Sequence, residues 1–485
     1  MNWLLVIVII HVVLVLLVCA RIIYETHSSV KALAYLLVVI FLPFIGIFLY
    51  FSFGINYRKR ILYSKKLISD DSTWSKIREE VYADSLQTYS DIDERYRPNK
   101  HLAKYLTSEL SPLTMGNTAT LLVNGEEKFP ALIKALEEAR EYIHIEYYIY
   151  ENDRIGQAIA DILIRKAKAG VTVRFIYDDF GSRGIRNNIS KKLIEAGIEA
   201  YPFYKIQFLR VAHHLNYRNH RKIIVIDGRK AFVGGINISN RYINDDAYPA
   251  KNKVFWRDTH LVVEGPGVRY LQYLFICDWN FSAGRPLENI YQYFPDFSDQ
   301  LPGKKVVQFA ASGPDSESPA ILYSLLYAIY QAEEEILITT PYFIPEQSIL
   351  DALVMAALGG VTVKLLVPEK GDSKLVDLAA RSYYEDLLNA GAKIFLYRKG
   401  FIHAKTIVVD KQLAVVGTAN MDYRSFDLNF EVNAIVYDRG FSAQLADVFQ
   451  VDLSDAVEID KIAWSRRSPY RKFLENSARL VSPLL

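Results

Sequence analysis

Two stretches of the chain each place a histidine, a lysine, an aspartate, a glycine and an asparagine at one spacing, H-x-K-x4-D-x6-G-x2-N. Each stretch also contains a run of aliphatic residues typical of a buried strand, so several ionisable groups crowd one short element. A single H-x-K strand is usually structural, but two complete copies in matching contexts indicate a reaction site. The two sets are His220, Lys222, Asp227, Gly234 and Asn237, and His403, Lys405, Asp410, Gly417 and Asn420.

The direction of the side chains predicts where these groups gather. Positions two apart on a strand point to the same face, so His220 lies beside Lys222 and His403 beside Lys405. If the two stretches pair symmetrically, one cleft receives both imidazoles, both ammonium groups and the two asparagine amides. Such a cluster needs an anion to neutralise it, and a phosphate diester is the obvious candidate.

Two histidines suit displacement at a phosphodiester. A neutral imidazole attacks phosphorus while a protonated one gives a proton to the leaving oxygen. We expect Asp227 and Asp410 each to hold the neighbouring or the facing imidazole in the required tautomer. This chemistry needs no metal and no cofactor. His213 and His214 are adjacent but have no third ligand in the sequence, so we interpret them as lining or packing residues.

Two further carboxylates occupy corresponding places downstream of the motifs. Asp258 lies in "WRD" and Glu431 in "NFE". We expect both to line the substrate site, and either one is placed to hydrogen-bond a catalytic histidine. The alternative for each is a charge in solvent at the end of a strand.

The elements around the motifs repeat. "KAGVTVRFIYDD" at 168–179 is echoed by "LGGVTVKLLVPE" at 358–369, and "LIEAGIEAYPF" at 193–203 by "LLNAGAKIFLY" at 387–397. Helical patterns alternate with short β-branched runs, which predicts α/β layers with helices covering buried strands. The first copy carries extra residues near 204–218, which mix aromatic, aliphatic and basic side chains. Internal duplication with one local insertion accounts for this pattern.

The N-terminus predicts a membrane anchor. Apolar residues fill 3–20 and 32–53, each about long enough to cross a bilayer as a helix, and the segment before Arg21 lacks the marks of a cleaved signal peptide. The basic residues that follow the second segment predict that everything after residue 57 lies in the cytoplasm. These basic residues are Arg58, Lys59, Arg60, Lys65 and Lys66.

We therefore divide the chain into a transmembrane hairpin (1–57), a partly helical cytoplasmic connector (58–115), a first lobe (116–295) and a second lobe (296–485). A net charge of +2 disfavours a nucleic-acid-binding surface. The two cysteines, Cys19 and Cys277, show no metal-binding spacing and cannot form a disulfide framework.

The paired motifs resemble the phospholipase D superfamily and, within it, the bacterial cardiolipin synthases. The resemblance covers nearly the whole chain, including the hydrophobic hairpin, "NHRKIIVIDGRKAFVGGINISNRY", "WRDTHLVVEGPGV", "TTPYFIPE", "GFIHAKTIVVD" and "VGTANMDYRSFDLNFEV". It implies an α/β fold in which the hairpin precedes two duplicated sandwich lobes related by a pseudo-twofold axis, with the active site between the lobes. It also implies a multi-pass protein of the bacterial inner membrane.

The resemblance further implies an activity. Two phosphatidylglycerol molecules in an anionic membrane would yield cardiolipin and glycerol through a phosphatidyl-histidine intermediate, with His220 as nucleophile and His403 as general acid and base. Asn237 and Asn420, with Asp258 and Glu431, would contact the substrate. Two alternatives stay open, a phosphodiesterase that passes the phosphatidyl group to water and a non-catalytic membrane scaffold. The oligomeric state and the acceptor alcohol stay undetermined.

Overall fold

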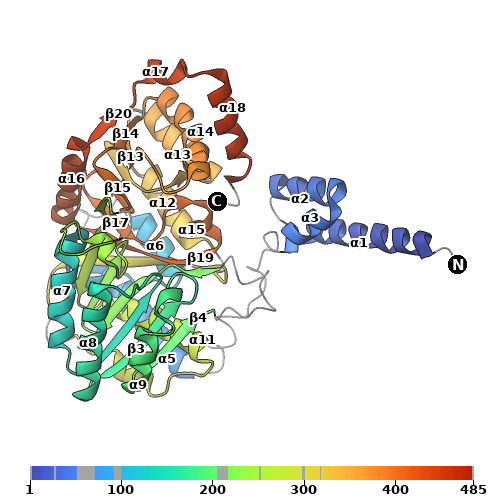
Figure 1. Ribbon diagram of the computed structural model, residues 1–485. Coiled ribbons are helices and arrows are strands. Elements are labelled where there is room, and N and C mark those ends of the chain that lie inside the picture. The colour runs from blue at the N-terminus through green and yellow to red at the C-terminus, as the bar shows by residue number, and fades with distance from the viewer. Residues whose placement is uncertain are drawn as a thin grey trace.

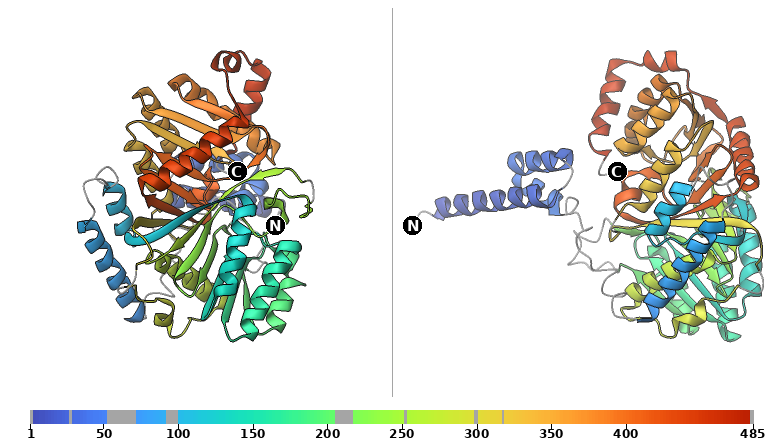
Figure 2. Two further views of the ribbon diagram at one scale, coloured as in Figure 1. Left: turned by 90° about the vertical axis from the view of Figure 1, so that its left-hand side faces the viewer. Right: turned by 180° about the vertical axis from the view of Figure 1, so that it is seen from behind.

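The computed structural model describes residues 3–26, 29–51, 72–91, 100–204, 217–250, 253–297, 301–316 and 318–482 (Figure 1). The basic cluster at 58–66, the two histidines at 213–214 and most of the predicted insertion lie outside these residues. Helices α1 to α3 at the N-terminus are drawn in blue, and the other described residues form a body with a lower half in green and an upper half in orange and red (Figures 1 and 2).

Helix α1 (Trp3–Glu25) is long and apolar enough to cross a membrane over Leu5–Glu25, and most of its apolar side chains are exposed. It is the one helix in the described part of the chain that meets this criterion. Exposed apolar surface of this length is what a bilayer core covers.

The second predicted span is not one continuous helix. Helix α2 (Ser29–Phe41) ends before Pro43, where the short helix α3 (Pro43–Leu49) begins. Proline has no amide hydrogen and its ring clashes with the preceding turn, which accounts for the break. Helix α3 packs closely against α2, since a Cβ on Gly46 would lie 2.5 Å from the backbone of Val39. The prediction of a spanning helix over 32–53 is therefore unsupported here.

The body is built on a sixteen-stranded sheet. Along the sheet the strands run β20, β14, β13, β11, β16, β17, β19, β10, β1, β9, β7, β6, β2, β3 and β4, and β5 pairs with β19 off this path. The bounds in the first half are β1 (Thr114–Val123), β2 (Tyr142–Tyr147), β3 (Thr172–Asp178), β4 (Glu199–Phe203), β5 (Arg218–Asn219), β6 (Lys222–Ile226), β7 (Lys230–Gly234) and β9 (Thr259–Glu264). Those in the second half are β10 (Lys305–Ser312), β11 (Glu335–Thr339), β13 (Thr362–Pro368), β14 (Lys393–Tyr397), β16 (Thr406–Val409), β17 (Leu413–Gly417), β19 (Asn429–Tyr437) and β20 (Ala456–Glu458).

The strand order repeats outward from the central pair β1 and β10. On one side it reads β1, β9, β7, β6, β2, β3, β4, and on the other β10, β19, β17, β16, β11, β13, β14. In both halves three parallel strands follow the strand of the H-x-K motif, which runs antiparallel to its neighbours. The two motif strands, β6 and β16, therefore hold equivalent places, as the repeated sequence predicts.

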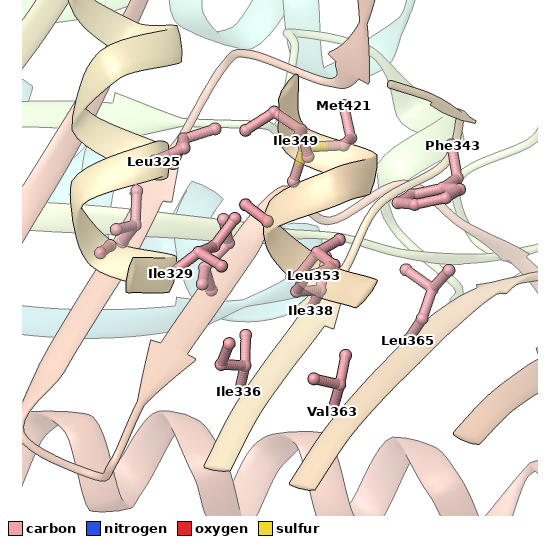
Figure 3. Close-up of a cluster of buried hydrophobic side chains, with 14 of the residues drawn as sticks. Leu325, Ile329, Ile336, Ile338, Phe343, Ile349, Leu353, Val363, Leu365 and Met421 are labelled. Atoms are coloured by element: carbon pink, nitrogen blue, oxygen red, sulfur yellow. The ribbon is translucent and has the colours of Figure 1, made fainter. Parts of the chain in front are cut away.

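Helices cover both faces of the sheet, as expected for the predicted α/β layers. One face carries α7 (Asn124–Glu138), α8 (Arg154–Lys168) and α9 (Ile189–Glu195) in the first half, and α12 (Ala320–Tyr330), α13 (Gln347–Leu358) and α14 (Lys374–Ala390) in the second. The other face carries α11 (Val268–Ala283) and α16 (Arg439–Ser454). Figure 3 shows part of the second-half core, where α12 and α13 pack on β11 and β13.

The remaining helices frame this body. Helices α5 (Ser72–Asp91) and α6 (Lys100–Ser108) fall in the segment predicted as a partly helical connector, and α6 packs against α12 and β10. Helix α15 (Tyr423–Asp427) follows the second motif. Helices α17 (Lys461–Ser465) and α18 (Pro469–Arg479) close the chain, with α18 against α14.

Candidate active site

Each motif histidine is carried on a segment that pairs with the other half of the chain. Strand β5 leads into His220 and runs parallel to β19, and the His220 amide donates to the Phe430 carbonyl at 3.0 Å. Strand β15 (Gly400–Ile402) leads into His403 and runs parallel to β8 (Phe255–Arg257), and the His403 amide donates to the Arg257 carbonyl at 2.7 Å. The two halves thus interlock at the motifs.

This exchange gives each imidazole a carboxylate from the opposite half. The Nδ1 atom of His220 lies 2.9 Å from the Glu431 carboxylate, and Nδ1 of His403 lies 2.7 Å from Asp258 Oδ2. All four side chains are buried. The hydrogen bonds that the sequence left open for Asp258 and Glu431 are present, and the alternative of a solvent-exposed charge at these two positions is wrong.

The carboxylate beside each ring favours a hydrogen on Nδ1. Burial lowers the pKa of His220 and lowers that of His403 to about 3, so both rings are neutral near pH 7. Burial opposes ionisation of Asp258 and Glu431, but the neighbouring His and Lys groups outweigh it and hold both carboxyl pKa values below their usual range. A neutral imidazole beside an ionised carboxylate donates its Nδ1 hydrogen. At His403 the ammonium of Lys405 also lies 2.9 Å from Nδ1 and competes with Asp258 for that nitrogen. With hydrogen on Nδ1, Nε2 carries the lone pair that can attack phosphorus or take a proton.

The two lysines complete the cluster. Lys222 Nζ donates to the His220 carbonyl at 2.7 Å, and Lys405 Nζ to the His403 carbonyl at 2.5 Å. The charge of Lys405 acts on His220 and that of Lys222 on His403, so the two motifs face one another as predicted. Burial lowers the pKa of Lys222 to about 7 and that of Lys405 to about 8. Two desolvated cations beside two imidazoles form a site for an anion.

These lysine pKa values predict how anion binding depends on pH. A lysine attracts an anion only when protonated, and the protonated form is lost as pH rises through about 7 for Lys222 and about 8 for Lys405. We expect the Kd of diethyl phosphate, a monoanion throughout this range, to rise about tenfold or more per pH unit above pH 8. Titration calorimetry from pH 6 to 9.5 measures this. A constant Kd across the range would contradict it.

The predicted role of Asp227 and Asp410 is wrong. Asp227 accepts the backbone N–H groups of residues 140–142 at 2.8–2.9 Å, and Asp410 those of residues 333–335 at the same distances. Each lies at the far end of its motif strand, and seven residues at about 3.3 Å each place it on the order of 20 Å from its own histidine. These carboxylates hold the starts of β2 and β11 and orient no imidazole.

A substitution separates this structural role from catalysis. Because Asp227→Ala leaves three backbone N–H groups without their charged acceptor, we expect the free energy of unfolding to fall by about 2 kcal/mol. The folded protein should keep its chemistry, since His220 retains Glu431. Thermal unfolding in detergent, compared with kcat below the transition, measures both. An unchanged Tm with a lost kcat would show instead that Asp227 serves the reaction, and Asp410→Ala provides the matched second case.

Comparison with known proteins then identifies the family. A family model described as "Cardiolipin synthase, PLD-like domain" matches residues 132–250 and 325–453. The chain belongs to the cardiolipin synthase family of the phospholipase D superfamily. A cardiolipin synthase of Geobacillus sp. (strain WCH70) is 41% identical over 461 residues, which cover 95% of this chain and 90% of that protein. One of Staphylococcus aureus (strain Mu50 / ATCC 700699) is 39% identical over 95% of this chain and 92% of that protein.

The fold of this cardiolipin synthase family member is also found in a solved structure. The crystal structure of phosphatidylserine synthase from Haemophilus influenzae Rd KW20 aligns with a TM-score of 0.58 and 16% identity, over 81% of this chain and 100% of that one. At this identity the similarity shows that the two proteins share a fold.

The two motif asparagines differ in their contacts. Asn237 is committed within the protein, since its Oδ1 accepts from the Ile149 amide at 3.2 Å and its Nδ2 donates to the Tyr242 hydroxyl at 2.6 Å. Asn420 donates from Nδ2 to Asp422 at 3.0 Å, while its buried Oδ1 has no hydrogen-bond partner among the described residues. Contact of either asparagine with substrate stays a prediction.

Two parts of the site were missed in the sequence. Lys128 on α7 is fully buried and donates to the carbonyls of Ile236 (3.0 Å) and Asn237 (3.4 Å), so it holds the loop after β7. Its place next to Phe129, on the apolar face of an amphipathic helix, was the available signal. Aromatic rings beside the histidines, among them Tyr148 at 4.8 Å from the His220 ring, had no sequence signal because their contacts are long-range.

Proposed function

We propose that the protein joins two phosphatidylglycerol molecules into cardiolipin and glycerol. It belongs to a family of phospholipid-modifying enzymes, and relatives about 40% identical over 95% of the chain are cardiolipin synthases. The observation that carries the proposal is the pair of buried imidazoles, each held at Nδ1 by a carboxylate of the opposite half and accompanied by a buried lysine. Such a site offers a nucleophile, an acid and charge stabilisation to one phosphodiester.

In the proposed reaction His220 Nε2 attacks phosphorus of the first lipid. The bond to the glycerol oxygen breaks, and that oxygen takes a proton from Nε2 of His403. The headgroup hydroxyl of the second lipid then gives its proton back to His403 while its oxygen attacks phosphorus and releases His220. Burial holds the pKa of His403 low, and the negative charge of a bound diester opposes that effect and favours the protonated ring. Lys222 and Lys405 stabilise the phosphoryl oxygens in both steps.

The finer architecture belongs to the same proposal. The repeated strand order supports two phospholipase D-like lobes related by a pseudo-twofold axis, with the site between them. Helix α1 supports membrane attachment, and the paired short helices α2 and α3 would complete the membrane-embedded hairpin. The basic residues at 58–66 favour a cytoplasmic body in a bacterial inner membrane. The anionic lipid phosphatidylglycerol would then reach the site from that membrane.

Lipid mass spectrometry tests the function directly. Purified protein in phosphatidylglycerol vesicles should yield one cardiolipin for each glycerol released. Phosphatidic acid with glycerol and no cardiolipin would identify a hydrolase instead. Unchanged lipid, with the protein folded and inserted, would leave only a scaffold role.

A further inference from the structure

The two sides of the site differ around the histidines. Three aromatic rings surround His403, with centroid distances of 5.5 Å to Trp256, 5.9 Å to Phe401 and 6.3 Å to Tyr242. The buried indole N–H of Trp256 has no hydrogen-bond acceptor among the described residues. An aromatic wall with an unused donor suits a small molecule that has both carbon faces and hydroxyl groups.

The His220 side has a different character. The position two residues before the histidine is Arg218 in the first motif and Phe401 in the second, each in the short strand that leads into its histidine. The guanidinium of Arg218 stacks on the Phe180 ring at 4.4 Å. The His403 side thus has three aromatic rings, with Arg241 stacked on Trp256 at 5.3 Å, whereas the one ring within 5 Å of His220 in the described contacts is Tyr148 at 4.8 Å.

Tyr342 extends the aromatic wall on the His403 side and binds a carboxylate through its hydroxyl. The Tyr342 ring lies 6.4 Å from that of Phe401, and its hydroxyl donates to Asp372 Oδ2 at 2.7 Å. Asp372 is exposed, and its charge acts on the buried ammonium of Lys405. A carboxylate whose charge reaches this cluster accepts hydrogen bonds from hydroxyl groups.

Asn420 lies beside this pair. Strand β12 (Phe343–Ile344) runs parallel to β18 (Met421–Asp422), which places Tyr342 next to Asn420 at the same end of the ladder. Thr340 ties the two segments together, accepting from the Met421 amide at 3.2 Å and donating to the Tyr342 carbonyl at 2.9 Å. The amide of Asn420 is oriented by its bond to Asp422, which leaves Oδ1 as a buried acceptor. Two acceptors therefore gather where the wall ends.

We propose that Asp372, with Tyr342 and the aromatic wall around His403, binds the hydroxyl groups of a polyol and thereby selects glycerol headgroups as the acceptor alcohol. The inference rests on the proposed function and identifies the residues that would bind the second substrate. In that step one glycerol hydroxyl gives its proton to His403 Nε2 as its oxygen bonds to phosphorus and the bond from phosphorus to His220 breaks. A neighbouring hydroxyl donates to Asp372 and fixes the attacking oxygen. Water and simple alcohols lack this second hydroxyl.

A competition experiment tests the selection. Wild-type protein in phosphatidylglycerol vesicles receives equal concentrations of deuterated glycerol and 1-propanol, and mass spectrometry gives the ratio of labelled phosphatidylglycerol to phosphatidylpropanol. We expect Asp372→Asn and Tyr342→Phe each to lower this ratio about tenfold, the effect of one hydrogen bond to a charged group. Asp386→Asn serves as control, because Asp386 is an exposed carboxylate on α14 that pairs with Arg479. The control should keep the wild-type ratio.

The ratio is independent of total turnover, so partial misfolding of a variant does not move it. An unchanged ratio in both variants, or an equal loss of both products, overturns the proposal. A wild-type preference for ethanolamine over glycerol that Asp372→Asn removes also overturns it, because the carboxylate would then select a cation. The labelled product forms even if the protein makes no cardiolipin, so a failure of the proposed function is seen separately.

Discussion

Replacing His403 with alanine should abolish phosphatidylglycerol turnover and leave phosphorylated protein at His220. A glycerol oxygen is a poor leaving group without a proton, so the loss for lipid should reach about 10⁴-fold. A diester with an activated phenol needs no acid for departure, so the first step should still release phenol. The adduct then accumulates, because no base activates the incoming alcohol. Phenol absorbance and mass spectrometry of the protein measure the two effects.

His220→Ala is the matched variant. It should abolish turnover of both substrates, because no covalent intermediate can form. An adduct found on His403 instead would reverse the two roles and keep the two-histidine mechanism. Turnover with no adduct in either variant would mean that water or alcohol attacks phosphorus directly.

Substitutions of Glu431 and Asp258, the carboxylates that contact the two imidazoles, should cause the second large loss of activity. Glu431→Gln and Asp258→Asn should each lower kcat for lipid by about 10³- to 10⁴-fold, since an amide no longer stabilises the tautomer with hydrogen on Nδ1. The variants should differ with the activated phenol. Glu431→Gln disables His220 and should lose phenol release, whereas Asp258→Asn disables His403 and should retain it. Kinetics with both diesters, with circular dichroism to confirm the fold, measure this split.

Each carboxylate variant should therefore resemble the variant of the histidine in the other half of the sequence. Glu431 follows the second motif but should behave as the partner of the first, and Asp258 the reverse. If Glu431→Gln instead matched His403→Ala, releasing phenol and trapping an adduct, the exchange of carboxylates would not operate in the working enzyme.

Part of this site follows from the spacing of the motifs. The sequence predicted that His220 lies beside Lys222 and His403 beside Lys405 on a strand, but His220 lies just before β6, and His403 and Lys405 lie between β15 and β16. The spacing argued against Asp227, which follows β6 and lies seven residues after His220. Its conformation at φ 51° and its bonds to residues 140–142 serve a turn. The analogy with catalytic triads led to the wrong prediction that Asp227 orients an imidazole.

Other features depend on contacts that no local pattern records. The pairing of β5 with β19 joins segments about two hundred residues apart in sequence, so nothing near His220 indicates that Glu431 would hold it. The break at Pro43 has a local cause that the sequence analysis did not weight enough. The apolar composition of 32–53 predicted one span, but the proline ring divides it into two helices. Fold class and motif placement were accessible in the sequence, whereas the partners of each imidazole required the tertiary structure.

The interlocked strands also set the order in which activity arises during synthesis. A growing chain exposes His220 long before the ribosome has made Glu431, and the strand on which β5 pairs is made at the same late stage. Until then His220, the proposed nucleophile, has neither its carboxylate partner nor the strand on which β5 pairs. We therefore expect any chain that stops before residue 431 to lack a working site at His220. We expect phospholipid chemistry to begin only after Glu431 and β19 have been made, so incomplete copies of the protein should be inactive.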